Sequence, residues 1–164
     1  MFTRNDIPVA GGMGDTGDMT ANDTWKIYPD SDDAVTTLEL AQGAGAQIVY
    51  PAIAVADLGS QAGPVDPSGA ELGIWQTDTF PGFTVLGEHG TPSWFELSTR
   101  DFTAAVSFYR SVFHWEIQEV GSTDDFRYSV MKNPDGEGGV GRHHGRHQPT
   151  ADGSLAALER LLGG

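Results

Sequence analysis

The order of the predicted secondary structure elements constrains the fold of this chain most, because one order occurs twice. A strand, a helix and further strands are predicted over residues 24–77, and the same succession is predicted again over residues 93–131. The segment between them (78–92) contains two prolines and three glycines, which is typical of a linker. Neither copy places a glycine-rich phosphate-binding turn after a strand, so a Rossmann-type unit is not expected.

Composition narrows the classes of protein further. The chain has 164 residues, of which 38% are hydrophobic, enough for one domain or two small ones with a packed core. A net charge of −14 disfavours nucleic acid and anionic membranes as partners, because both are bound through Lys and Arg. The absence of cysteine excludes disulfides, thiolate metal sites and cysteine nucleophiles. The sequence shows no bilayer-spanning apolar run and no signal peptide, so we expect a cytoplasmic protein.

The clearest helix prediction in the chain covers residues 100–115. Asp101 is placed to cap its N-terminus. Apolar side chains that share one helical face are expected to be buried, and these are Ala105, Phe108, Tyr109 and Val112.

Three motifs carry a resemblance to a known family. They are "DPSGAELGIWQ" (66–76), "WFELSTRD" (94–101) and "FYRSVFHW" (108–115). In their order and spacing they resemble the vicinal oxygen chelate superfamily, also called the glyoxalase/bleomycin-resistance/dioxygenase family. More narrowly, the chain is similar to actinobacterial proteins that carry two such domains in tandem. The resemblance implies an α+β fold of βαβββ modules, two of which pair to enclose a cavity for a small molecule.

By this resemblance the chain holds parts of two domains. Residues 1–77 are expected to contain the end of one module and a complete second βαβββ module. Residues 78–92 are the expected linker, and residues 93–140 the first module of the next domain. The two modules are expected to pair with each other, or across two copies as a module-swapped homodimer, because exposed apolar sheet faces favour such contacts.

The tail, residues 141–164, departs from the family pattern. The family continues with a stretch such as "VAGIMDA", and plausible codons for that stretch read "VGRHHGR" once a single base is inserted. We therefore predict that residues from about 141 onward are a frameshift product and form a disordered tail. On this interpretation the chain is a fragment of a longer reading frame.

The same tail holds three histidines, His143, His144 and His147. The frameshift interpretation predicts that they have no evolved role. The rival interpretation is a histidine-rich metal-binding tract. It requires further ligands, for which the tail offers Asp152 and Glu159.

Enzymes of the family hold a divalent metal with His, Gln or Glu side chains on the first and last strands of each module. The resemblance puts these positions at Trp94, at Lys26 or Trp25, and at Gly73, with a fourth in the tail. None of the named residues is a metal ligand. We therefore expect no metal and no other cofactor, and the catalytic residues stay unassigned.

A ligand pocket is the function that remains, and its candidate residues are Trp75, Trp94, Glu96 and Tyr128. Strand alternation puts Trp94, Glu96 and Ser98 on one face, which the resemblance makes the cavity side. Flat aromatic side chains with one polar group suit a small aromatic or heterocyclic ligand. The alternatives are that the tryptophans simply pack in the sheet and that Glu96 is an exposed rim carboxylate.

The sequence thus predicts a small-molecule-binding protein that works without a metal. One alternative is a fragment of a metal-dependent, glyoxalase-like lyase or dioxygenase whose metal ligands lie outside this chain. Another is a nonfunctional gene fragment. The sequence names no substrate under any of these interpretations.

Overall fold

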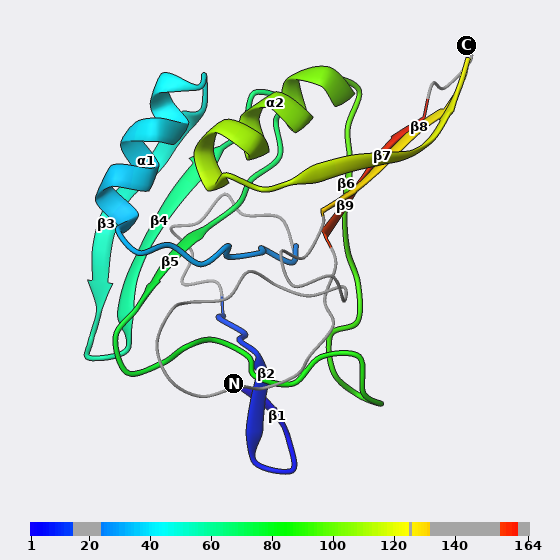
Figure 1. Cartoon of the computed structure of the whole chain (residues 1–164). Coiled ribbons are helices and arrows are strands. Elements are labelled where there is room, and N and C mark those ends of the chain that lie inside the picture. The colour runs from blue at the N-terminus through cyan, green and yellow to red at the C-terminus, as the bar shows by residue number, and fades with distance from the viewer. Residues whose placement is uncertain (15–23, 125, 132–154, 161–164) are drawn as a thin grey trace.

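The computed structural model describes residues 1–14, 24–124, 126–131 and 155–160 (Figure 1). The helices of this part are α1 (Ala34–Gly43) and α2 (Phe102–Phe113). Its strands are β1 (Phe2–Arg4), β2 (Ile7–Ala10), β3 (Gln47–Val55), β4 (Gly59–Val65), β5 (Ile74–Thr77), β6 (Phe95–Ser98), β7 (Ile117–Thr123), β8 (Phe126–Met131) and β9 (Leu155–Arg160). Strand ladders other than β6–β9 are antiparallel. The predicted α+β class is confirmed.

The first βαβββ unit contains α1 and the antiparallel sheet β3–β4–β5. The backbone of residues 27–31 lies beside β5, where it accepts hydrogen bonds from the amides of Gly73 and Trp75 at 2.8 and 2.9 Å. The strand predicted at the start of this unit, over residues 24–29, is not formed there, and the isolated parallel bridge lies at Asp30, opposite Trp75. Pro29 has no N–H group, which limits the ladder it can form. In space, residues 27–31 therefore lie beside β5. β5 pairs with β4, and β4 pairs with β3.

The second unit has the same order of elements in space, β6–β9–β8–β7. β9 runs parallel to β6 and antiparallel to β8. Residues 155–160, which we predicted as part of a disordered tail, form this strand in the structure. An extended segment between β6 and β8 satisfies the backbone N–H and C=O groups of both strands, which favours its pairing there. His143, His144 and His147 lie outside the described residues, and a frameshift origin of the tail stays a prediction.

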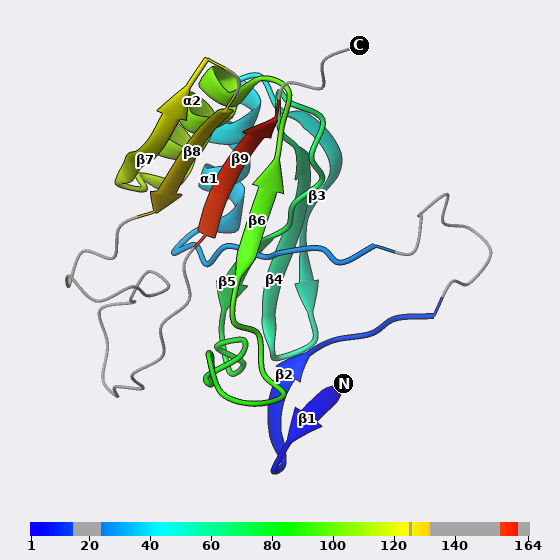
Figure 2. The ribbon, with the colours of Figure 1, turned by 90° about the vertical axis from the view of Figure 1, so that its right-hand side faces the viewer.

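α1 contacts β3, β4 and β5 of the first sheet, and α2 contacts β9 of the second. Figure 2 shows α2 behind β7 and β8, and α1 behind β9. The two helices also contact each other, so the two units meet within one chain through their helical sides. A module-swapped homodimer stays a prediction.

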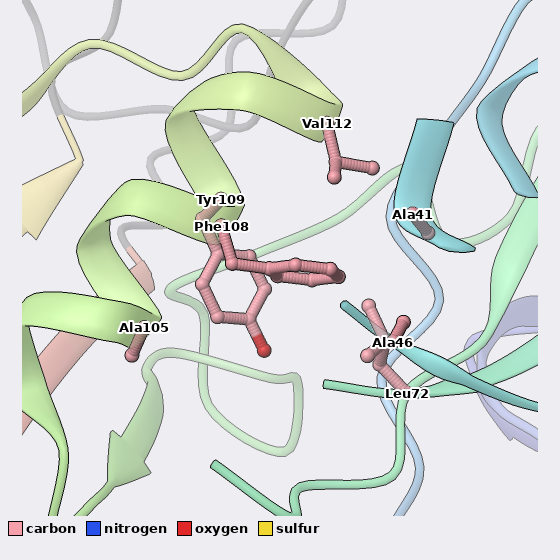
Figure 3. Packing of buried hydrophobic residues seen from close by; sticks show 7 residues of the cluster. All are labelled: Ala41, Ala46, Leu72, Ala105, Phe108, Tyr109 and Val112. Atoms are coloured by element: carbon pink, nitrogen blue, oxygen red, sulfur yellow. The ribbon is translucent and has the colours of Figure 1, made fainter. Parts of the chain in front are cut away.

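The main core lies between the two units. Its buried residues come from α1, from the segments that flank the first sheet and from α2: Ala41, Ala46, Leu72, Ala105, Phe108, Tyr109 and Val112. Figure 3 shows the Phe108 ring pointing from α2 toward Ala46 and Leu72. The apolar face predicted for α2 is thus confirmed as the buried one. A smaller cluster under α1 packs Leu38 against Ile74 of β5.

A buried hydrogen bond joins two of the motifs across this core. The Tyr109 hydroxyl donates to Asp66 Oδ2 at 3.1 Å. The other oxygen, Oδ1, accepts from the amides of Ser68 and Ala70 at 2.8 and 2.9 Å, which fixes the turn after β4. Burial, and then the Asp66 carboxylate, raise the pKa of Tyr109 above its ordinary value.

Each helix begins with an aspartate cap. The Asp33 carboxylate accepts from the amides of Val35 and Thr36 at 3.0 Å, ahead of α1. Asp101 accepts from the amide of Ala104 at 3.0 Å, which confirms the predicted cap of α2.

The remaining described segments contain little regular structure. β1 and β2 form a hairpin, and residues 78–92 connect β5 toward β6 without a helix or strand. Arg4 of the hairpin and Glu88 of this connection form an ion pair at 2.6 Å. Within the described ranges, no helix is long and apolar enough to cross a membrane.

Candidate functional site

Three of the four predicted ligand-binding residues meet at one carboxylate. Glu96 Oε2 lies 3.4 Å from the donor Nε1 of Trp94 and 3.3 Å from the donor hydroxyl of Tyr128. Trp94 immediately precedes β6, Glu96 lies in β6 and Tyr128 lies in β8, with β9 between the two strands. We call these three residues the Glu96 cluster.

Strand alternation explains why the cluster faces away from α2. Leu97 of β6 packs against the main core, so its neighbour Glu96 points to the opposite face. In β8, Ser129 is 3% exposed, and Tyr128 therefore lies on the other face. The sequence predicted this shared face for Trp94 and Glu96, and the structure adds Tyr128 to it.

Aromatic side chains give the cluster a flat, open surface. The Trp94 side chain is exposed, at 48%. The Phe126 ring stacks on Tyr128 with ring centroids 6.0 Å apart and an interplanar angle of 6°. Partial burial, and then the Glu96 carboxylate, raise the pKa of Tyr128 above its ordinary value.

Trp75, the fourth predicted residue, does not join the cluster in any contact of the structure. Its Nε1 donates to the Phe80 carbonyl at 2.9 Å, and the two rings are in edge contact. The space above Gly59 is filled by the same indole ring. Trp75 has the contacts of a packing residue, and a ligand-binding role for it stays a prediction.

The described family metal positions do not fit a divalent ion. At the first-strand position, the Lys26 ammonium group lies 3.1 Å from Glu71 Oε2. The side chain at this position is therefore itself a cation. The Tyr28 ring covers Gly73, where a Cβ would come within 2.0 Å of that ring. Trp94 offers an indole N–H, which is not a metal ligand. Among the described residues, no group of three His, Cys, Asp or Glu side chains converges for a metal.

Two tyrosines on the first sheet were missed by the sequence analysis. Tyr28 lies over Gly73, and Tyr50 lies over Gly63 of β4, where a Cβ would come within 2.1 Å of the ring. Lys26 Nζ is 5.8 Å from the centre of the Tyr50 ring. The detectable signal was the glycine inside each predicted strand, because such glycines often mark a close approach of another group.

Comparison with known proteins places this geometry in context. Two relatives are named as the glyoxylase CFP32, one from Mycobacterium bovis and one from Mycobacterium tuberculosis. Each is 31% identical to this chain over 115 residues, which is 70% of this chain and 44% of the relative. The anthracycline biosynthesis protein DauV of a Streptomyces species is 33% identical over 87 residues, 53% of this chain and 32% of that protein. No family model matches the chain.

Solved structures give a weaker likeness. A glyoxylase/bleomycin resistance protein/dioxygenase domain from a Frankia species has a TM-score of 0.49 at 12% identity, covering 88% of this chain and 96% of that one. TnmS3, an antibiotic binding protein from a Streptomyces species, has a TM-score of 0.43 at 14% identity, covering 86% of this chain and all of that one (100%).

The repeated order of strands and the sequence relatives together define the class. This chain belongs to the vicinal oxygen chelate superfamily, the group of glyoxalases, bleomycin-resistance proteins and dioxygenases. It spans less than half the length of the curated relatives it matches.

Proposed function

We propose that this chain is a small-molecule-binding module that works without a metal and takes a planar aromatic ligand bearing a cationic, hydrogen-bond-donating group. The observation that carries the proposal is the Glu96 cluster, a carboxylate held between an indole and a phenol on an open sheet face. Both donors contact Oε2, and no donor of the described residues is placed on Oε1. A ligand N–H group can therefore bind Oε1 without displacing either neighbour.

Charge and surface chemistry support the same class of ligand. Trp94, beside the Glu96 carboxylate, and Phe126, which stacks on Tyr128, are exposed aromatic side chains, and a planar cation can stack on an exposed ring face. The net charge of −14 attracts cations toward the whole chain and repels anions. The name of DauV also agrees with a fused-ring aromatic ligand, since anthracyclines are molecules of that kind.

The metal-dependent alternative is a glyoxalase-like lyase or dioxygenase, with this chain as part of it. Its support is that the mycobacterial relatives are named as glyoxylases and are longer than the matched region. The residues at the described metal positions favour the metal-free proposal over this one, because they supply an ammonium group, an indole and a glycine.

A titration with proflavine, a planar aminoacridine cation, tests the proposal by isothermal calorimetry. Glu96→Gln should weaken binding about tenfold, because a charge-assisted hydrogen bond becomes a neutral one. Glu39→Gln on the exposed face of α1 is the matched control, since it removes the same charge away from the cluster. Equal affinities of the two variants would contradict the assignment of the cluster as the binding site.

A further inference from the structure

A groove of about 520 Å³ lies on the opposite side of the second sheet from the Glu96 cluster, between α2 and the strands β7 and β8. Its strand wall includes Ser129, whose neighbour Tyr128 faces the other way. The two surfaces are therefore separated by the sheet itself. A volume of this size lies within the range of small-molecule sites.

The helical wall of the groove is one face of α2. Its side chains recur at the spacing that places residues on one helical stripe, and they are Thr103, Val106, Ser107, Arg110 and Ser111. The wall thus joins an apolar centre at Val106 to several hydroxyl groups and one guanidinium group. This combination of apolar surface with a few polar groups is typical of a ligand pocket.

The guanidinium group on the strand wall is held in place by three neighbours. Arg127 donates to Glu119 Oε2 at 2.9 Å and to Thr103 Oγ1 at 3.1 Å. Its Cζ lies 4.3 Å from the centre of the Phe102 ring. The Glu119 carboxylate therefore offsets the charge of Arg127, and this side of the groove is close to neutral.

Arg110 is different, because the acceptor that it contacts among the described residues is neutral. Its Nη2 donates to the backbone carbonyl of Ile117, which is a neutral acceptor. The contact orients the guanidinium group at the junction of α2 and β7. With Arg127 offset by Glu119, the charged side chains that line the groove sum to one positive charge, in a chain of net charge −14.

We propose that this groove is a second ligand site, which binds a small organic carboxylate through Arg110. The carboxylate accepts hydrogen bonds from the guanidinium N–H groups of Arg110, and Ser107 lies one helical turn away for a further polar contact. The apolar part of the ligand lies along Val106. The site is independent of the Glu96 cluster, since it uses the other sheet face and the opposite ligand charge.

The test is a titration with 2-naphthoate, followed by chemical shifts of the backbone amides. We expect shifts along α2, β7 and β8, and about tenfold weaker binding in Arg110→Gln. Arg4→Gln is the charge-matched control in the hairpin and should bind 2-naphthoate like the unaltered chain. The neutral analogue 2-naphthamide should bind equally to the unaltered chain and to Arg110→Gln, which shows that the groove of the variant is intact.

Two results would overturn this inference. One is equal affinity of 2-naphthoate for Arg110→Gln and Arg4→Gln. The other is a set of shifts confined to β6 and the Tyr128 face of β8. Glu96→Gln should leave the affinity for 2-naphthoate unchanged. The two proposals can therefore be tested separately, because each uses its own ligand and its own variant.

Discussion

The hydroxyl of Tyr109 on α2 lies 3.1 Å from Asp66 Oδ2 in the turn after β4, and this bond joins the two βαβββ units inside their shared core. Tyr109→Phe should lower the free energy of unfolding by about 1–2 kcal/mol, because it leaves a buried carboxylate oxygen without its donor. Urea denaturation measures the change. Tyr128→Phe is the control, since it removes an exposed hydroxyl and should cost less than about 0.5 kcal/mol. A Tyr109→Phe variant as stable as the unaltered chain would show that the bond does not hold the units together.

Alkaline pH should weaken the fold through the half-buried Tyr50 and the buried Tyr109. Burial raises the pKa of both Tyr50 and Tyr109 above the ordinary value of 10.0. Their folded pKa values exceed the unfolded ones, so this stability is fully present below pH 10.0 and is lost as the pH rises above it toward the folded values. Urea midpoints measured from about pH 9 to 11 should fall, and should fall less steeply for Tyr109→Phe. An identical slope in the two proteins would contradict this source of the pH dependence.

Gly63→Ala should destabilise the first sheet by about 1–3 kcal/mol, because the new Cβ would come within 2.1 Å of the Tyr50 ring. Tyr50→Ala should lower the free energy of unfolding less in the Gly63→Ala variant than in the unaltered chain, because the clash has already displaced the Tyr50 ring. Gly43→Ala at the end of α1 is the control. Nothing lies within 4 Å of its Cβ, so it should be neutral or slightly stabilising. Strictly additive effects in thermal unfolding would show that Tyr50 and Gly63 are not in contact.

The parts of the fold that depend on local patterns could be predicted from the sequence. The cap at Asp101 and the buried face of α2 follow from helical spacing, and both are confirmed. The common face of Trp94 and Glu96 follows from alternation along one strand, and it led to the cluster. These predictions needed no knowledge of which strands pair.

The features that were missed depend on pairing between distant segments. Residues 155–160 were predicted to be disordered because the tail was interpreted as a frameshift product. Their place as β9 depends on the gap between β6 and β8, which no local pattern indicates. Tyr28 lies over Gly73 only because residues 27–31 pair with β5 in one register. No local pattern in the sequence indicates that register. The frameshift prediction concerns the gene, and resequencing from the codons of Asn133 onward would test it.

The measurement that tests the central claim most directly is a proflavine titration of protein dialysed against EDTA, with its metal content determined before and after dialysis. We expect no stoichiometric divalent ion and the same proflavine affinity in both samples, because the Glu96 cluster supplies the binding groups itself. A stoichiometric divalent ion whose removal abolishes binding, and whose return restores it, would contradict the account and favour the metal-dependent alternative.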